Sequence, residues 1–427
     1  MSEPIIATPQ SVGEVDLANP DFWMAPAEVR EAAFALLRRD TPIAFHKEFE
    51  VPPEVPLPQG PGHWSLTRYA DVLAASRDSE TFCSGKGTTI PDLPIEFAEF
   101  FGSMISMDDP RHGRLRRIVS RGFTPKALKR LEAGVRRRAA AIVDRVIEKG
   151  ECDFVSEIAA PLPLEIICDM MGIPDSHSSF IFEQTNVILG LGDPDYADPL
   201  NIVPAALMAG QRLATLMNEI AKDRRGNPGD DLTSQLVNAE VDGDVLTEQE
   251  LASFFVLLVA AGNETTRNAI SHGMKALCDY PDERRKWAAD FDAVAPTAVE
   301  EIVRWASPVI HFRRTATRDT ELSGQKIAEG DKVVLWYNSA NRDEAVFEDA
   351  SRFSVDRTPN EHVGFGGPGA HYCLGANLAK REMTVMFREI FQRLPDLEIT
   401  GEPAMLRSNF IHGIKRMPCE FTPGGAD

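Results

Sequence analysis

The chain has 427 residues, of which 43% are hydrophobic and 26% are charged. These values are typical of a globular protein and argue against a disordered chain. The net charge of −20, from 45 Lys and Arg against 65 Asp and Glu, disfavours general binding to nucleic acid. The sequence contains no run of ~18 uninterrupted apolar residues, so it predicts no transmembrane helix. Residues 1–20 lack the basic start and apolar run of a signal peptide. We therefore expect a soluble, cytoplasmic protein.

The N-terminal part of the chain predicts an arm, a loop and a strand. Residues 1–20 are polar with prolines, which indicates a loose arm. Residues 51–62 hold five prolines and two glycines, and such a composition forms neither a helix nor a central strand. Residues 63–69 have the pattern of a short strand. Because no linker interrupts the rest of the chain, we expect residues 21–427 to form a single domain.

Helical periodicity dominates the middle of the chain. Apolar residues recur at spacings of three and four in segments such as 127–149 and 200–225. Strand signals return late, since residues 321–337 predict two short strands around a turn at 328–331. The expected fold class is therefore mainly α with small β-sheets.

Residues 110–130 form a basic segment in an otherwise acidic chain. The segment contains no Asp or Glu. In a chain of net charge −20, this segregation indicates a docking surface, and the alternative is an ordinary solvated basic helix. The cations of the segment are Arg111, Arg114, Arg116, Arg117, Arg121, Lys126, Lys129 and Arg130.

A capping box predicts the start of a long buried helix. The Thr247 hydroxyl can accept from the amide of Glu250, and the Glu250 side chain can reach back. Pro281 sets the end of the helix near Tyr280. Such a helix is on the order of 50 Å long at 1.5 Å per residue, enough to cross a domain. Residues 254–261 are apolar on every side, which indicates that the helix is buried.

Polar residues interrupt this helix at residues 262–266, which read Gly-Asn-Glu-Thr-Thr. Gly262 alone costs about 1 kcal/mol against alanine, and a buried unpaired carboxylate costs more. Such a costly sequence indicates a functional site, in which Gly262 opens a groove while Glu264 and Thr265 handle protons. The alternative is a helix whose polar face meets water at this turn.

The six cysteines include no C-x-x-C pair, so neither a disulfide framework nor a zinc ribbon is expected. Residues 362–375, HVGFGGPGAHYCLG, contain a G-x-G-x-x-G match, but the dinucleotide motif needs a βαβ unit that the sequence does not predict. Cys373 gives a better explanation. Glycines let a large group approach, Phe365 supplies an apolar wall, and a helix predicted over 374–394 brings its N-terminal amides near the thiolate. A thiolate in this setting suits haem iron as an axial ligand.

Three motifs, in order along the chain, resemble those of the cytochrome P-450 family of haem-thiolate monooxygenases. Residues 365–375 resemble the haem-binding loop, residues 261–266 the oxygen-activation motif of the long I helix, and Glu301-x-x-Arg304 the paired residues of the K helix. The resemblance implies the cytochrome P-450 fold, with haem b held between the I helix and the cysteine loop with its following L helix. It also implies that Cys373 is the proximal ligand of the haem iron.

Further residues of the family's pattern map onto this sequence. Glu264 and Thr265 match the pair that relays protons in catalysis, and Arg357 matches the residue that completes the Glu301–Arg304 network. The loop departs from the pattern in one respect, because the stretch from Phe365 to Cys373 is one residue longer than usual. Besides Cys373, the haem contacts implied by the resemblance are His112, Arg116, Arg314, His371, Phe365, Gly366, Ala261 and Gly262.

The resemblance extends to one subgroup of the family. Segments such as VAAGNETTRNAI and APTAVEEIVRWASPV are similar to those of mycobacterial enzymes that oxidise lipid side chains, above all methyl-branched lipid omega-hydroxylases. This similarity implies insertion of one oxygen atom of O2 at the terminal carbon of a methyl-branched lipid, or of a sterol or isoprenoid side chain. It implies electrons from NAD(P)H through a ferredoxin reductase and a ferredoxin. We expect an acidic ferredoxin to dock on the basic segment 110–130.

Terminal oxidation needs a narrow pocket that presents only the chain end, because primary C–H bonds are stronger than secondary ones. Two other functions stay open: a biosynthetic hydroxylase of polyketides or terpenoids, and a haem sensor or lipid carrier without turnover. A peroxygenase is disfavoured, since in the family those enzymes lack the acid–threonine pair found here. The candidate pocket walls, each of which could instead be ordinary core, are Phe101, Met104, Ile105, Ile188, Leu189, Ala260, Val309, Ile310, Phe410 and Ile411.

Overall fold

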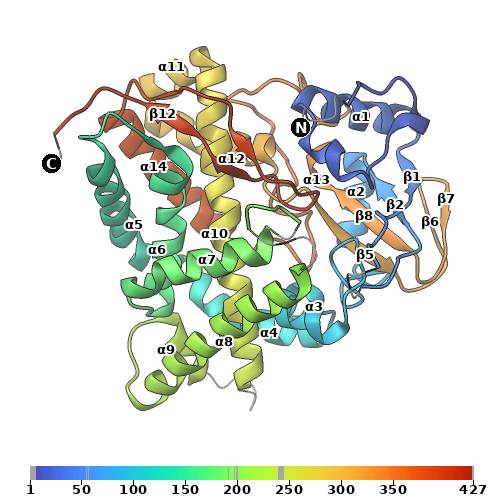
Figure 1. The fold of residues 1–427 in the computed structure, drawn as a ribbon, viewed down its shortest axis with the longest axis horizontal. Coiled ribbons are helices and arrows are strands. Elements are labelled where there is room, and N and C mark those ends of the chain that lie inside the picture. The colour runs from blue at the N-terminus through green and yellow to red at the C-terminus, as the bar shows by residue number, and fades with distance from the viewer. Residues whose placement is uncertain are drawn as a thin grey trace.

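The computed structural model describes residues 6–425 apart from positions 54, 56, 191, 197, 199–200 and 239–244 (Figure 1). Helices dominate and the sheets are small, which confirms the predicted class. The α-helices are α1 (Ala27–Asp40), α2 (Tyr69–Arg77), α3 (Ile95–Gly102), α4 (Arg111–Val119), α5 (Pro125–Val146), α6 (Pro161–Met171), α7 (Ser178–Leu189), α8 (Ile202–Gly226), α9 (Leu232–Val237), α10 (Glu248–Asp279), α11 (Pro281–Ala289), α12 (Phe291–Ala306), α13 (Tyr337–Ala340) and α14 (Ala376–Arg393).

The strands form one larger sheet and three small ones. The five-stranded sheet has the order β1 (Ile43–His46), β2 (His63–Leu66), β8 (Lys332–Trp336), β5 (His311–Ala316) and β3 (Phe82–Cys83), and only its β2–β8 pair is parallel. The others are β4 (Glu151–Asp153) with β12 (Pro418–Glu420) and β9 (Glu398–Ile399), β10 (Ala404–Met405) with β11 (Ile414–Arg416), and β6 (Thr320–Leu322) with β7 (Gln325–Ile327).

The strands around the predicted turn at 328–331 do not pair with each other. Instead β7 pairs with β6 across Ser323 and Gly324, whose φ angles are +47° and +84°. Two positive φ angles suit the tight turn of a two-residue hairpin. The strand after residue 331, β8, joins the five-stranded sheet between β2 and β5. The sequence located these strands but not their partners.

The N-terminal segment is more closely packed than the expected loose arm. Val12–Glu14 form a 3-10 turn, and Val15 and Leu17 are buried. They join an apolar cluster with Trp23 and Trp336, which stack with ring centroids 5.2 Å apart. The two buried residues anchor the segment because they bring apolar surface into contact with these rings. Residues 1–5 of the predicted arm lie outside the described residues.

Helix α10 is the central element of the fold and contacts α3, α6, α7, α8, α12 and α14 (Figure 1). Its predicted capping box is present: the Glu250 amide donates to the Thr247 hydroxyl (3.1 Å) and the Thr247 amide to the Glu250 carboxylate (2.9 Å). The helix ends at Asp279, and Pro281 begins α11. No helix within the described part of the chain is long and apolar enough to cross a membrane.

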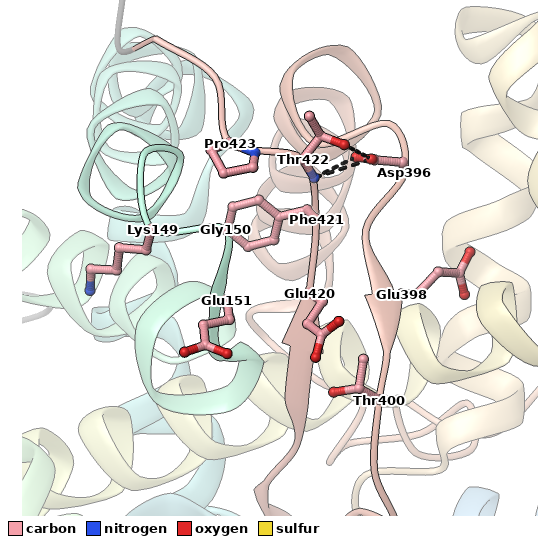
Figure 2. A pocket seen from close by; sticks show the side chains of 10 residues that line it. All are labelled: Lys149, Gly150, Glu151, Asp396, Glu398, Thr400, Glu420, Phe421, Thr422 and Pro423. Atoms are coloured by element: carbon pink, nitrogen blue, oxygen red, sulfur yellow. Dashed lines mark hydrogen bonds between the residues drawn. The ribbon is translucent and has the colours of Figure 1, made fainter.

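A surface groove of about 610 Å³ lies along the three-stranded sheet (Figure 2). Its lining includes Glu151, Asp396 and Glu420, and Asp396 already accepts hydrogen bonds from Thr422. None of the candidate site residues lines this groove. It therefore plays no part in the candidate active site.

Candidate active site

Cys373 stands just before α14, in a loop whose shape depends on glycines. The Cys373 amide donates to the Phe365 carbonyl (2.9 Å). Gly366 and Gly369 have φ angles of +83° and +156°, which side chains disfavour. A Cβ at Gly369 would also lie 2.2 Å from the Ser76 carbonyl oxygen of α2. The loop is thus seated against α2 by glycines that no other residue could replace without strain.

The Cys373 side chain is surrounded by protein and yet accessible, so it borders an internal hollow. Burial raises the pKa of its thiol, whereas the amides of Gly375 and Ala376 and the guanidinium of Arg116 lower it. The amides at the start of α14 therefore act as predicted, although burial outweighs them. A cation bound at the sulfur would favour the thiolate.

Helix α10 also borders open space, at the polar turn that the sequence singled out. Ala261 is exposed although Ala260 and Asn263 on either side are buried. Thr265, one turn further, is half-buried, and its hydroxyl donates to the Ala261 carbonyl (2.6 Å). Ala261 and Thr265 therefore mark an accessible side within an otherwise buried helix.

Gly262 is half-buried, next to the accessible Ala261. A Cβ at this position would lie 2.7 Å from Cδ1 of Ile167, the flexible end of a side chain on α6. The close approach of Ile167 adds a packing reason for glycine, and the groove and the haem contact at Gly262 stay predictions.

Glu264 lies in a buried polar cluster, apart from the accessible side that carries Thr265. Its side chain is 2% exposed and forms an ion pair with Arg267. The Asn268 amide nitrogen donates to the same carboxylate oxygen (3.1 Å). The sequence analysis missed Arg267 and Asn268, although their spacing of three and four residues from Glu264 places them beside it on a helix.

Two arginines and two histidines converge beside the cysteine loop. The rings of His112 and His371 have centroids 4.3 Å apart, and Arg116 donates to the Tyr372 carbonyl (2.6 Å). Burial and the charges of Arg314, His112 and Arg116 lower the pKa of His371 to about 2. Among the described residues no carboxylate pairs with Arg116 or Arg314, and Nε2 of His112 is buried without a partner. Such a cluster suits an anionic group.

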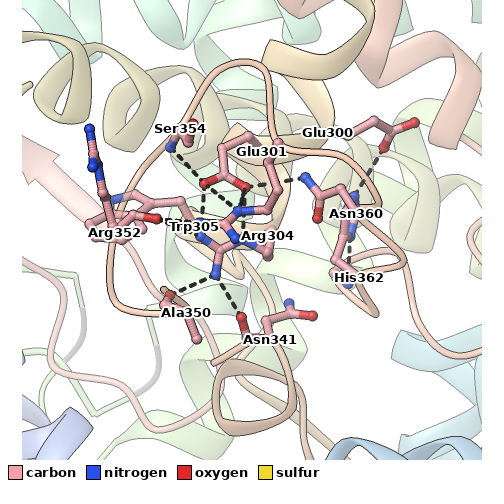
Figure 3. A network of polar contacts seen from close by, with 12 residues as sticks. Glu300, Glu301, Arg304, Trp305, Asn341, Ala350, Arg352, Ser354, Asn360 and His362 are labelled. Atoms are coloured by element: carbon pink, nitrogen blue, oxygen red, sulfur yellow. Dashed lines mark hydrogen bonds and ion pairs between the residues drawn. The ribbon is translucent and has the colours of Figure 1, made fainter. Parts of the chain in front are cut away.

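Glu301 and Arg304 on α12, the pair matched to the family's K helix, lie in a polar network with residues of the loops before the cysteine loop (Figure 3). Arg304 binds Glu301 through two nitrogens (2.7 and 2.8 Å), and both side chains are 0% exposed. Arg357 also donates to Glu301 (3.1 Å), as the resemblance implied. The network includes residues that no spacing could identify, because they come from distant loops: the carbonyls of Asn341 and Ala350, the amide of Ser354 and the side chain of Asn360.

The candidate pocket walls fall into distinct groups. Val309 and Ile411 pair in an isolated bridge, and the Ile310 amide donates to the Phe410 carbonyl (2.8 Å), so these two segments do meet. The side chain of Ile310, however, packs in the N-terminal cluster with Trp336 and is core rather than wall. Five of the remaining candidates pack in or against the main core around α10, namely Phe101, Met104, Ile105, Ile188 and Leu189, and Ala260 on α10 itself is buried.

Comparison with known proteins identifies this architecture. A family model described as cytochrome P450 (here P-450) matches residues 206–395. A methyl-branched lipid omega-hydroxylase of Mycobacterium tuberculosis is 55% identical over 96% of this chain and 95% of its own length. The chain belongs to the cytochrome P-450 family. A steroid C26-monooxygenase of Rhodococcus jostii is 39% identical over 98% of this P-450 chain and 87% of its own.

Solved P-450 structures agree with this assignment. A Mycobacterium marinum cytochrome P-450 in complex with pseudoionone has a TM-score of 0.91, with 42% identity over 98% of this chain and 100% of that chain. The cytochrome P-450 of the Bacillus subtilis bacillaene polyketide synthase has a TM-score of 0.81, with 31% identity over 93% of this chain and 98% of that chain.

The protein is a P-450 monooxygenase whose cofactor is haem with a cysteine thiolate ligand. The residues present fit that group. Haem b carries two carboxylates, and Arg116 and Arg314 offer donors and positive charge with no carboxylate partner among the described residues. Nδ1 of the neighbouring His112 lies 3.6 Å from Asp109, whereas its Nε2 is buried without a partner in the described part of the chain. The side chains of Cys373 and Ala261 are accessible.

Proposed function

We propose that this P-450 hydroxylates the terminal carbon of a methyl-branched lipid, or of a sterol or isoprenoid side chain. The observation that carries the proposal is the 55% identity, over nearly the whole chain, to an enzyme named methyl-branched lipid omega-hydroxylase. The similarity to a steroid C26-monooxygenase supports side-chain oxidation more broadly. Both relatives oxidise lipids, which favours a lipid over a small polar substrate.

In this proposal Cys373 is the axial ligand, and His112, Arg116, Arg314 and His371 bind the haem carboxylates. When bound, the haem supplies the activation of O2 and the transfer of one oxygen atom to a C–H bond. Charge complementarity supports the assignment, because two arginines that have no carboxylate partner among the described residues stand beside the loop. Phe365 and Gly366 complete the loop wall, and Ala261 lines the opposite side.

Thr265 and Glu264 deliver protons in this proposal. The Thr265 hydroxyl is half-buried, and its one bond to a described residue is to the Ala261 carbonyl of its own helix, so it can rotate toward an oxygen of the substrate site. Glu264 is screened from solvent, which suits a group that must pass on protons without admitting bulk water. The arrangement supports a relay in which the acid lies behind the alcohol.

A narrow pocket accounts for selection of the chain end. Helix α3 is bound to α10, because the Ser253 hydroxyl donates to the Glu99 carbonyl (2.7 Å). It also packs on α8, where a Cβ at Gly210 would lie 2.6 Å from Phe100 and 2.9 Å from Phe101. These tight contacts support a fixed wall around the substrate. A fixed wall limits which carbon can approach the reacting centre.

Electrons come, in this proposal, from NAD(P)H through a ferredoxin reductase and an acidic ferredoxin. The basic surface available for docking is smaller than the sequence suggested, because Arg111 pairs with Glu99 (2.7 Å) and Arg114 with Glu250 (2.8 Å). The exposed cations that support the docking surface are Arg121, Lys126, Lys129 and Arg130, whereas Arg117, also exposed, has an interaction of its own.

Titration of the ferric protein tests the substrate. A methyl-branched fatty acid should convert the Soret band from low to high spin at lower concentration than its straight-chain isomer does. Product analysis should then find the hydroxyl at the chain end. Absence of a spin shift with both acids, in protein that keeps its thiolate spectrum, would discard the lipid and retain the enzyme class.

Substitution of Cys373 tests the ligand. Cys373→Ser should abolish the red-shifted carbon-monoxide complex that thiolate ligation produces. Cys278→Ser, at a half-buried cysteine away from the loop, is the matched control and should leave the spectrum unchanged. An unaltered spectrum in Cys373→Ser contradicts the assignment.

A second function is favoured by one observation. The P-450 of a polyketide synthase has a TM-score of 0.81 to this chain, which supports a biosynthetic hydroxylase as the alternative. A polyketide that shifts the spin state when no lipid does would favour it. Formation of any hydroxylated product with electron partners present excludes a sensor or carrier without turnover.

A further inference from the structure

The carboxylate of Glu264 is held by two residues one turn further along α10. Arg267 pairs with one carboxylate oxygen, and the Asn268 amide nitrogen donates to the same oxygen (3.1 Å). The second oxygen is buried and has no partner among the described residues. Both charged side chains are nearly inaccessible, at 2% and 3% exposure. Arg267 thus fixes the direction of the carboxylate.

Arg267 and Asn268 are each hydrogen-bonded to a different element outside α10. Arg267 donates through its second terminal nitrogen to the Asn186 side-chain oxygen on α7 (3.1 Å), and its guanidinium lies over the Phe182 ring. The Asn268 side-chain oxygen accepts from the amide of Ile414 on β11 (3.1 Å). The carboxylate is therefore connected to α7 through one residue and to β11 through the other.

The segment after α7 and the strand β11 are themselves joined by charge. Lys415, next to Ile414, binds Asp193 (2.9 Å) and Asp195 (2.7 Å). Asp193 is 1% exposed and also accepts from the Arg407 amide (2.9 Å). The contacts form a closed circuit from Glu264 through α7, across the ion pairs to β11, and back through Asn268. A displacement of α7 from β11 breaks this circuit.

We propose that Arg267 is a positioning residue for Glu264, and that Asn186 and the Ile414 amide set its position according to how α7 and β11 pack. The inference rests on the proposed role of Glu264 in proton delivery. When α7 and β11 pack together, both donors hold the acid in one orientation. When they separate, Glu264 loses its restraints. The carboxylate is therefore aligned for proton delivery only when α7 and β11 pack together.

Infrared spectroscopy of the haem-loaded protein tests the restraint without turnover or substrate. In Arg267→Gln the buried Glu264 loses the one cation that it contacts among the described residues and takes up a proton, because an unpaired buried carboxylate is too costly. Burial raises the pKa of Glu382 to about 8, so the wild type already has a protonated-carboxyl band. A further band should therefore appear in Arg267→Gln, and it should be absent from the wild type, from Arg267→Lys and from Arg267→Gln/Glu264→Gln. No new band, or a band that persists in the double variant, overturns the proposal.

Coupling measurements test the consequence for catalysis, with any compound that shifts the spin state. Arg267→Gln and the milder Asn186→Ala should each lower product formed per NAD(P)H consumed while leaving the affinity from the spin shift unchanged. Arg267→Lys should restore most of the coupling. Arg225→Gln, which removes a surface ion pair with Glu248, is the control. If Arg267→Gln lowers only the yield of folded enzyme and coupling is unaltered, Arg267 is a structural residue and the proposal is wrong.

The two measurements separate this inference from the proposed substrate. The infrared band depends only on the buried pair, so it decides the positioning role even if methyl-branched lipids do not bind. Conversely, a lipid that binds and is hydroxylated by a protein in which Arg267→Gln gives no band supports the substrate and removes the positioning role.

Discussion

The molecule contains two buried acid–arginine pairs with the same spacing on a helix, and they differ in how completely they are satisfied. On α12, Glu301 accepts from Arg304, Arg357, Asn360 and the Ser354 amide. On α10, one oxygen of Glu264 and Nε of Arg267 are buried without partners. The neighbouring Asn263 has neither of its amide atoms bonded among the described residues.

This difference separates a structural pair from one that is free to change. A buried polar network rigidifies its surroundings only when every member is satisfied. Glu301 and Arg304 meet that condition, because every oxygen and nitrogen of their two side chains is bonded, and the pair fixes the loops that lead to Cys373. At the edge of the network, Oδ1 of Asn360 is buried without a partner among the described residues. The Glu264 cluster does not meet the condition, because one carboxylate oxygen and Nε of Arg267 lack partners among the described residues, so it is less completely restrained than the Glu301–Arg304 pair. The same sequence pattern thus supports stability in one helix and chemistry in the other.

The largest effect is expected from neutralising each acid in turn. Glu301→Gln should cost about 3–5 kcal/mol of unfolding free energy, because Arg304 and Arg357 lose a buried partner. Glu264→Gln should cost less, about 1–3 kcal/mol, since one of its oxygens already lacks a partner. Denaturant unfolding of the holoenzyme measures both. Glu248→Gln, at an exposed ion pair, is the control and should lie within ~0.5 kcal/mol of the wild type. Equal losses of unfolding free energy in Glu301→Gln and Glu264→Gln would contradict the distinction between the two pairs.

Acid sensitivity is expected from the buried histidines. Burial lowers the pKa of His311 from 6.5 to about 4. The folded state therefore excludes a proton that the unfolded state binds, so stability present above pH 6.5 is lost as the pH falls toward 4. The loss at His311 is roughly 3 kcal/mol across that window.

Urea unfolding at pH 7 and pH 5 checks this expectation. The difference in unfolding free energy between the two pH values should shrink by about 2 kcal/mol in His311→Gln. Burial also lowers the pKa values of His46 and His272 to about 4, so these two residues should still make the stability of the variant depend on pH. An unchanged difference in the variant would show that His311 is accessible to protons in the folded state.

Thr265→Ala should affect catalysis while leaving the free energy of unfolding almost unaltered. In the part of the chain that the structure describes, the hydroxyl donates to the Ala261 carbonyl of its own helix alone, so its removal costs less than ~1 kcal/mol. Consumption of NAD(P)H should nevertheless outrun product formation, because the relay loses its alcohol. Thr297→Ala, whose hydroxyl also donates to its own helix, is the control. Intact coupling in Thr265→Ala would reduce Thr265 to an ordinary helical residue.

The smallest effect is expected at the surface. Arg121→Gln/Lys129→Gln should slow reduction by an acidic ferredoxin at low salt, and the difference from the wild type should vanish as salt rises. Stability should not change, since both residues are exposed. Reduction kinetics followed by stopped flow measure this effect, and salt-independent kinetics in the wild type would rule out electrostatic docking there.

Local signals in the sequence were sufficient for much of the fold and for part of the candidate site. The capping box at Thr247 and the stop at Pro281 placed α10 to within a residue, because both act on neighbouring atoms. Non-local contacts were not predictable. Arg114 meets Glu250 across 136 positions of sequence, and Gly262 packs against Ile167 of another helix. No periodicity within one segment reports such encounters.

The Glu301–Arg304 network bears on the order in which the enzyme is assembled. All of its donors and acceptors belong to the polypeptide, so the loops leading to Cys373 can reach their final shape before any cofactor arrives. Haem then binds to loops that already have their final conformation. Cells short of haem should accumulate an apoprotein that gains its spectrum on addition of hemin, without passing through the unfolded chain.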